Sequence, residues 1–442
     1  MGMGKCKKLC SGQKETARMK DNELIKWQSG DKAAISRNIE GFLEILNVDK
    51  NGKVSSTEIF AVERYTLLLA HLVQMSGVES LETKKNLIDR AFFNRLKTYQ
   101  RQTITEFRTA LATETRAYLG QPTSRYITLY PLHIDPANYE GPSTFSVLGL
   151  EIQVSNWREV ENAFQMDNFF KRVSALPHTA HLALIRDYLP LLLETEARYP
   201  SEAFHLAYES AHLLRSILNV QSSIFRGQLQ VGYPSPYAEF LPPRAYAVFD
   251  PHGKLQQFNY STDSVWKRDV KKLTNERCQY AQEFADAIGI PKSENEIAYL
   301  LAYAIGTYGH ALDTADRRSS FLIMWQILEF LTLQSSENFS QRTVMNRVSA
   351  LLKQTNMVRD SMRFLTDVRN KYVHHGQFPD ETALEILNIL KLVVEQAIVR
   401  IFESRTDLPT TASLARFYDH ATESTSGLKD RARIIQLLLE RK

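Results

Sequence analysis

Helical periodicity of apolar residues in the last third of the chain is the feature that most restricts its fold. From about Glu294 to Phe402, apolar residues recur three or four positions apart, the spacing that places them on one face of a helix. The pattern predicts five helices, near 295–313, 318–334, 340–354, 358–375 and 380–403. In the last of these, the apolar positions are Leu384, Leu387, Leu390, Val394, Ala397 and Ile401. This stretch is therefore predicted to form a helical bundle.

The whole chain is predicted to be mainly α-helical and multidomain, since 442 residues exceed the length of one typical domain. The predicted segments are a basic mobile tail (1–30), a helical region (31–120), a mixed α/β middle region (121–290), the helical bundle (291–405), and a loop with a short helix near 428–441 (406–442). Within the middle region, stretches rich in β-forming residues predict strands at 126–134, 145–154, 223–231 and 245–250, and helical spacing spans 158–220.

Composition excludes several classes of protein. Hydrophobic residues make up 43% and charged residues 24% of the chain, as in globular proteins. No apolar run approaches the ~18–20 residues of a membrane span, and the amino terminus lacks the apolar segment of a signal peptide. Three cysteines cannot form a disulfide framework. A cytoplasmic protein without a membrane span is therefore expected.

The end of the fourth predicted helix carries the residues best suited to catalysis. The segment R-N-K-Y-V-H-H-G runs from Arg369 to Gly376, and Asn370 and His374 stand four residues apart, on one helix face. Glycine is common just past a helix end, so His374 and His375 fall in the last turn, where the helix dipole favours a protonated imidazole.

A proton-transferring histidine beside an arginine suits transphosphorylation of RNA. In that reaction the 2′-hydroxyl attacks the adjacent phosphate, and the guanidinium stabilises the extra charge on the pentavalent phosphorus. This chemistry requires no metal ion. Arg369, Asn370, His374 and His375 are therefore candidate catalytic residues.

The motif resembles that of the HEPN superfamily, more narrowly of its Apea-like branch. The family pattern of an arginine, a polar residue, a spacer and a histidine is matched by Arg369, Asn370 and His374, with His375 as a variant of the spacing. Glu329, in the apolar segment WQILEFL two helices upstream, stands where the family commonly has an acidic residue. The resemblance covers about a quarter of the chain and implies that residues 291–405 form a HEPN bundle.

The resemblance also implies a function. HEPN nucleases are metal-independent endoribonucleases that cut tRNA or other RNA, and many act in antiviral defence, abortive infection or toxin systems. They require no cofactor, and two copies face each other in a homodimer or a larger homo-oligomer. A further protein of the same defence system is an expected partner.

Local charge fits an RNA partner. The first twenty residues carry a net charge of +5, so the rest of the chain sums to −1 and offers no global basic field. Between residues 339 and 371, however, seven basic residues stand against two aspartates. Arg359, Arg363 and Lys371, in the same predicted helix as the motif, are candidate RNA-binding residues.

A different class of function fits the same residues. Charged side chains often form a solvated helix face, and Arg369 has the length to bridge within the bundle. The alternative is therefore a non-catalytic HEPN interaction or scaffold protein, with calcium sensing by a loop near the amino terminus.

That loop, residues 47–58, matches the spacing of an EF-hand calcium site between two predicted helices. Its candidate Ca²⁺ ligands are Asn47, Asp49, Asn51, Lys53 (through the carbonyl), Ser55 and Glu58. Only two of these side chains are carboxylates and no second loop pairs with the first, so affinity is expected to be weak. The alternative is a plain connection built on the Asn51-Gly52 turn.

The remaining histidines carry less information. His178, His181, His205 and His212 stand at spacings that allow approach to a metal ion, but nothing fixes a third ligand. They are therefore interpreted as packed or surface residues.

Overall fold

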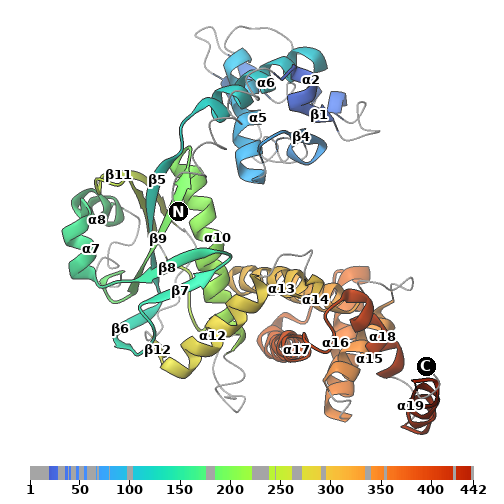
Figure 1. Ribbon diagram of the computed structural model, residues 1–442. Helices are drawn as coiled ribbons and strands as arrows, with labels where there is room; N and C mark the ends of the chain where they lie inside the picture. Colours follow the sequence, from blue (N-terminus) through green and yellow to red (C-terminus); the bar gives the residue numbers. More distant parts are fainter. Residues whose placement is uncertain are drawn as a thin grey trace. The chain divides into compact units, whose positions relative to one another are not determined.

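The structure is a computed structural model, shown in Figure 1, and it divides the chain into two compact units. Unit 1 comprises residues 1–125 and 196–205, and unit 2 comprises residues 126–195 and 206–442. The residues that the structure describes are 19–27, 35–37, 39–40, 46–48, 54–56, 66, 69–78, 80–96, 103–175, 185–221, 238–243, 245–260, 271–289, 295–333, 340–352, 356–421 and 425–439. Within these ranges the protein is mostly helical, and no helix is both long and apolar enough to cross a membrane.

Two consecutive helices form the main part of unit 1. They are α5 (Leu81–Leu96) and α6 (Ile104–Gly120). The α6 helix begins at Thr103, whose side chain accepts a hydrogen bond from the Glu106 backbone N–H at 3.3 Å, while the Glu106 carboxylate accepts from the Thr103 N–H at 2.7 Å. This reciprocal capping box fixes the start of the helix. Phe92 of α5 stacks on Phe107 of α6 in the core, with ring centroids 4.5 Å apart.

The short elements of unit 1 correct the prediction of a mobile tail at 1–30. A helix α2 (Asp21–Leu24) and a strand β1 (Ile25–Trp27) lie inside the predicted tail, and β1 pairs with β4 (Val73–Met75). They are ordered because Leu24 and Ile25 are buried in the core. Strands β2 (Leu46–Val48) and β3 (Val54–Ser56) pair antiparallel, where the sequence predicts the ends of an EF-hand loop between helices.

A six-stranded sheet occupies the middle of the chain. Its strand order is β11-β10-β5-β9-β8-β7. The strands are β5 (Ser124–Leu132), β7 (Thr144–Val147), β8 (Leu150–Val154), β9 (Leu189–Ala197), β10 (Ala245–Phe249) and β11 (Leu255–Tyr260). Antiparallel pairing joins β10 to β11 and β5, and β8 to β7 and β9. A separate parallel pair joins β6 (Ile134–Tyr139) and β12 (Lys271–Leu273).

The two faces of this sheet are covered by different helices, as Figure 1 shows. Successive side chains of a strand point to opposite faces. Accordingly Leu129 of β5 lies in one buried cluster with the side chains of α7 (Trp157–Ala163) and α8 (Met166–Ser174). Its neighbour Tyr130 lies in another cluster, with α10 (Pro200–Val220).

Strand β9 corrects the helical prediction for 158–220. The segment LPLLLETEA is rich in leucine, which favours helices in isolation. In the sheet, Leu191, Leu193 and Thr195 are buried, whereas Glu194 and Glu196 are exposed. This alternation is the strand pattern, and pairing with β8 decides the conformation. The strand predicted at 223–231 lies outside the described residues.

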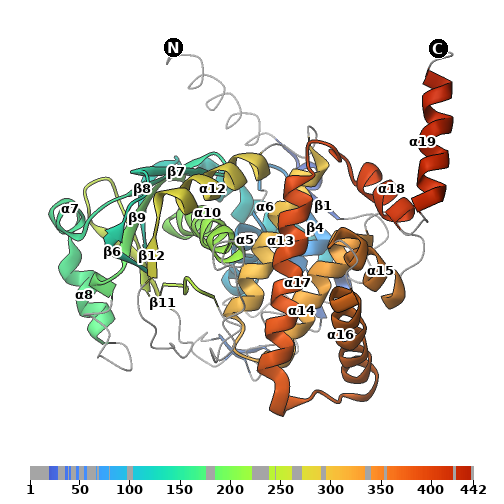
Figure 2. The same cartoon turned by 90° about the horizontal axis from the view of Figure 1, so that it is seen from below.

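The carboxy-terminal third confirms the prediction of a helical region. The five predicted helices correspond to α13 (Glu296–Asp313), α14 (Arg317–Leu333), α15 (Gln341–Leu351), α16 (Asn356–His375) and α17 (Ala383–Glu403), with a 3-10 turn η2 (Asp380–Thr382) before the last. The helix α12 (Asn275–Ile288) precedes them. In Figure 2, α13, α14 and α17 lie side by side, with α15 and α16 beyond α14.

Two helices follow the bundle, where the sequence predicts one. They are α18 (Thr411–Ala421) and α19 (Thr425–Leu439). The α18 helix falls in the predicted loop, and it is held by Leu414 and Tyr418, which are buried against the bundle. The tertiary contact therefore stabilises a helix too short to be recognised from periodicity alone.

Candidate active site

The motif identified in the sequence lies at the carboxy-terminal end of α16. Met362, Leu365 and Val368 are buried and attach this helix to the bundle. After His375, Gly376 adopts a φ of +66°, and its N–H donates to the Tyr372 carbonyl at 2.8 Å. This is the left-handed cap that favours glycine. The cap ends the helix directly after the two histidines.

Arg369 is held at this helix end by an acidic residue from another helix. Its Nη2 lies 3.6 Å from Oε1 of Glu329 in α14, and the two side chains are 19% and 27% exposed. The Nη1 of Arg369 is 3.5 Å from Oδ1 of the neighbouring Asn370. The structure therefore brings together Arg369, Asn370 and the acidic residue singled out from the sequence.

Glu329 is itself fixed by two neutral donors. Its Oε1 accepts hydrogen bonds from the indole N–H of Trp325 at 3.0 Å and from the side-chain amide of Gln341 at 2.9 Å. Gln341 belongs to no motif of the sequence. A glutamine at the first position of a helix carries no signal in one sequence, and only the packing of α15 against α14 shows its role.

The two histidines of the motif face solvent. His374 and His375 are both exposed, and their ring centroids are 6.4 Å apart. Among the described residues, the polar partners of Arg369 are Glu329 and Asn370. Its guanidinium contacts neither imidazole. The motif thus presents a half-buried guanidinium and two accessible imidazoles at one helix end.

The basic residues of α16 extend along the helix from this end. Arg359, Arg363 and Lys371 are exposed. Arg359 and Arg363 precede His374 by 15 and 11 residues, close to whole numbers of helical turns, so both lie on the histidine's side of the helix. Arg363 makes a loose ion pair with Asp360 at 3.7 Å.

Arg347 does not belong to this exposed basic surface, although it contributes to the charge counted in the sequence. It is buried in α15 and donates to the Thr332 carbonyl and, at 2.9 Å, to Asp419 of α18. Its guanidinium therefore ties α14, α15 and α18 together and is not available to a ligand.

The calcium prediction for 47–58 is only partly covered by the structure. Asn47 and Ser55 are opposite each other in the β2–β3 pair, whereas Asp49, Asn51, Lys53 and Glu58 lie outside the described residues. Calcium binding by this loop stays a prediction. Among the described residues, no group of three or more His, Cys, Asp or Glu side chains is placed to hold a metal ion.

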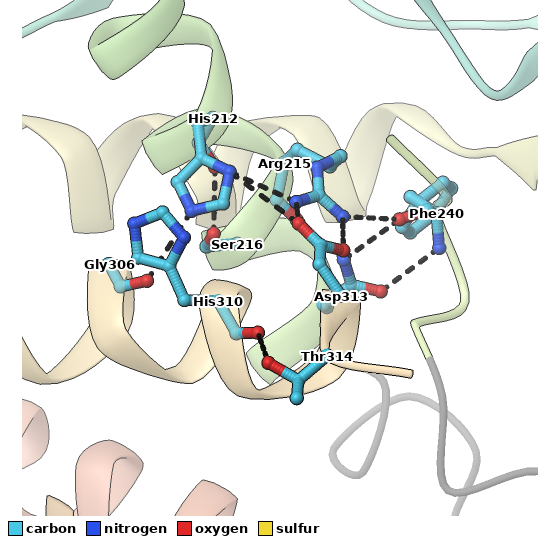
Figure 3. A network of polar contacts seen from close by, with 9 residues as sticks. His212, Arg215, Ser216, Phe240, Gly306, His310, Asp313 and Thr314 are labelled. Carbon is cyan, nitrogen blue, oxygen red and sulfur yellow. Dashed lines mark hydrogen bonds and ion pairs between the residues drawn. The ribbon is translucent and has the colours of Figure 1, made fainter. Parts of the chain in front are cut away.

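A second polar cluster lies between α10 and α13 (Figure 3). Its members come from distant parts of the chain, so no sequence motif marks it. Arg215 is fully buried and forms a two-pronged ion pair with Asp313, and its Nη1 donates to the Phe240 carbonyl at 3.1 Å. Its Nη2 lies 3.0 Å from Nδ1 of His212. The cluster joins α10, of the sheet layer, to the first helix of the bundle.

The partners of His212 define its protonation state. Arginine is always a donor, so Nδ1 of His212 must accept, and Nε2 carries the proton and faces the Gly306 carbonyl at 3.4 Å. Burial, together with the charge of Arg215, lowers the pKa of His212 from 6.5 to about 2. His212 is therefore a buried neutral histidine that stacks on His310, in agreement with the packed interpretation. His178 and His181 lie outside the described residues.

We expect acid to destabilise the protein through His212. Its pKa is lower in the folded than in the unfolded chain, so below about pH 6.5 the unfolded state binds an extra proton. The free energy of unfolding should then fall by up to about 1.4 kcal/mol per pH unit from this group. Urea denaturation between pH 8 and pH 4 should show that the free energy of unfolding falls less steeply in His212→Asn than in wild type. The asparagine keeps an acceptor for Arg215 but does not titrate. If the free energy of unfolding fell equally steeply with pH in wild type and His212→Asn, the assignment of His212 as a buried neutral histidine would be wrong.

Comparison of the chain with protein-family models, with curated proteins and with solved structures finds no match in any of the three.

Proposed function

We propose that the carboxy-terminal bundle is a HEPN-like, metal-independent endoribonuclease with its active site at the end of α16. The observation that carries the proposal is the placement of Arg369 beside Asn370 by Glu329, on the helix end that exposes His374 and His375. A guanidinium and two imidazoles are the groups that transphosphorylation of RNA requires.

In the proposed mechanism, His374 removes the proton of the 2′-hydroxyl, whose oxygen then attacks the adjacent phosphorus. Arg369 stabilises the added negative charge on the phosphate oxygens, and Asn370 orients the phosphate. The bond to the 5′-oxygen breaks, and that oxygen takes a proton from a general acid, a role that fits His375. The products are a 2′,3′-cyclic phosphate and a 5′-hydroxyl.

The exposed basic residues of α16 support RNA as the substrate class. Arg359, Arg363 and Lys371 can contact the phosphates of a strand that runs along the helix. A homodimer, which would bring two motifs into one cleft, and a role in antiviral defence with a partner protein belong to the same proposal.

A second function is favoured by the burial of Arg369. A guanidinium that is 19% exposed and paired with Glu329 also suits a structural tie between α14 and α16. In that case the bundle is a non-catalytic interaction module. The two functions differ in one respect that can be measured, which is whether the protein cleaves RNA.

We expect the purified protein to cleave tRNA or total RNA in the presence of EDTA and to leave 2′,3′-cyclic phosphate ends. An oligonucleotide with a single 2′-deoxynucleotide at the scission site should resist cleavage, because the attacking hydroxyl is missing. End-group analysis by mass spectrometry checks both results. Cleavage that stops in EDTA, or products with 3′-hydroxyl ends, would contradict the mechanism, and a complete lack of cleavage would favour the interaction module.

A further inference from the structure

The carboxylate of Glu329 lies at the centre of a network that joins three helices. The indole N–H of Trp325, one turn earlier in α14, is shared between Glu329 Oε1 at 3.0 Å and Gln341 Oε1 at 2.9 Å. The amide nitrogen of Gln341, at the start of α15, donates to the same Glu329 oxygen at 2.9 Å. Arg369 of α16 approaches that oxygen at 3.6 Å.

The chemistry of the partners fixes the orientation of the Gln341 amide. An indole can only donate and a carboxylate can only accept. Gln341 must therefore turn its oxygen to Trp325 and its nitrogen to Glu329, because the reversed amide would oppose like groups on both sides. Trp325 is 1% exposed, so close packing on all sides holds the anchor of the network in place.

The neutral donors and the guanidinium lie at different distances from Glu329 Oε1. The two neutral groups satisfy Glu329 Oε1 at hydrogen-bond distance and leave its charge intact. Arg369, at 3.6 Å, lies beyond the 2.7–3.2 Å of an N–H···O bond. The carboxylate thus attracts the guanidinium without engaging its N–H groups strongly, and they stay available to a phosphate.

We propose that Gln341 is a positioning residue of the site, which acts through Glu329 to hold the guanidinium of Arg369 in place. The inference rests on the nuclease function proposed above and adds a residue from a third helix to it. Without the Gln341 amide, Glu329 Oε1 loses a donor and is free to form a direct hydrogen bond with Arg369, which turns the guanidinium away from the phosphate.

The test compares Gln341→Ala, Gln341→Glu and wild type in RNA cleavage. We expect kcat to fall about 10- to 100-fold in Gln341→Ala, as for a misplaced catalytic group. KM should change little, because the exposed basic residues of α16 bind the strand. Gln326→Ala, an exposed glutamine of α14 one residue after Trp325, is the matched control and should retain wild-type kcat.

Gln341→Glu gives a readout that a packing role would not produce. A glutamate at the first position of a helix favours the helix dipole, so α15 should stay folded. Near pH 8 the introduced carboxylate repels Glu329. Two carboxylates in contact share one proton as the pH falls, and the shared proton restores the donor that the amide supplied. The activity of this variant relative to wild type should therefore rise between pH 8 and pH 5.

The outcomes separate this inference from the nuclease proposal. Unchanged kcat in Gln341→Ala, or a constant activity ratio with pH in Gln341→Glu, would overturn the role of Gln341 if Arg369→Ala is inactive. If Arg369→Ala cleaves RNA as well as wild type, the proposed function itself fails, whatever the Gln341 variants do. Thermal unfolding of each variant shows that the proteins compared are folded.

Discussion

Replacing Arg369 by alanine should lower the rate of RNA cleavage by about 10²–10³-fold, the loss typical for removal of one group that stabilises transition-state charge. His374→Ala should cost about 10²–10⁴-fold, as expected for a general acid or base. Initial rates on a defined RNA oligonucleotide, in EDTA, measure both effects.

The matched controls are residues of the same type outside the site. Arg400→Ala, at a partly exposed arginine of α17 that pairs with Glu403, should retain wild-type activity. So should His252→Ala, at an exposed histidine of the turn between β10 and β11. Activity of Arg369→Ala and His374→Ala equal to that of the controls would rule out this site.

The largest effect on stability is expected at Asp313. Arg215 is fully buried, and Asp313 is the carboxylate with which it forms its ion pair. Removal of one partner of a buried pair leaves an uncompensated charge in the core and costs about 3–5 kcal/mol. Asp313→Ala should therefore lower the urea midpoint of the full-length protein strongly, measured by circular dichroism.

An exposed pair of the same type provides the control. Arg318 and Asp380 form an ion pair with side chains that are 44% and 63% exposed. Exposed pairs contribute little, because water already solvates both charges, so Asp380→Ala should unfold at nearly the same urea concentration as wild type. Similar shifts for the two variants would mean that the α10–α13 cluster contributes no more than a surface contact.

The helices of the bundle could be predicted from local sequence because their apolar positions repeat with the period of the helix. The same holds for the end of α16, where Gly376 marks the cap and so places His374 and His375 in the last turn. Strand β9 could not be predicted in this way. Its leucines suit a helix, and only pairing with the neighbouring strands β5 and β8 makes the extended form the more stable one.

The polar clusters also differ in whether local sequence is enough to predict them. Arg369, Asn370 and His374 are close in sequence, and one helix places all three near its carboxy-terminal end. Gln341 and Arg369 are separated by 28 residues and meet through a glutamate on a third helix. Likewise His212 and Asp313 lie on α10 and α13, and both contact Arg215. No periodicity connects such residues.

Local sequence is enough to predict the helical carboxy-terminal third, the turn after the two histidines, and the chemical types available at that turn. These features depend on backbone preference and on side chains one or two turns apart, and both are local. Tertiary contacts set the conformation of β9, the neutral state of His212 and the partners of Glu329. Each of these depends on burial and on hydrogen bonds between distant segments, whose free energies exist only once the chain has folded.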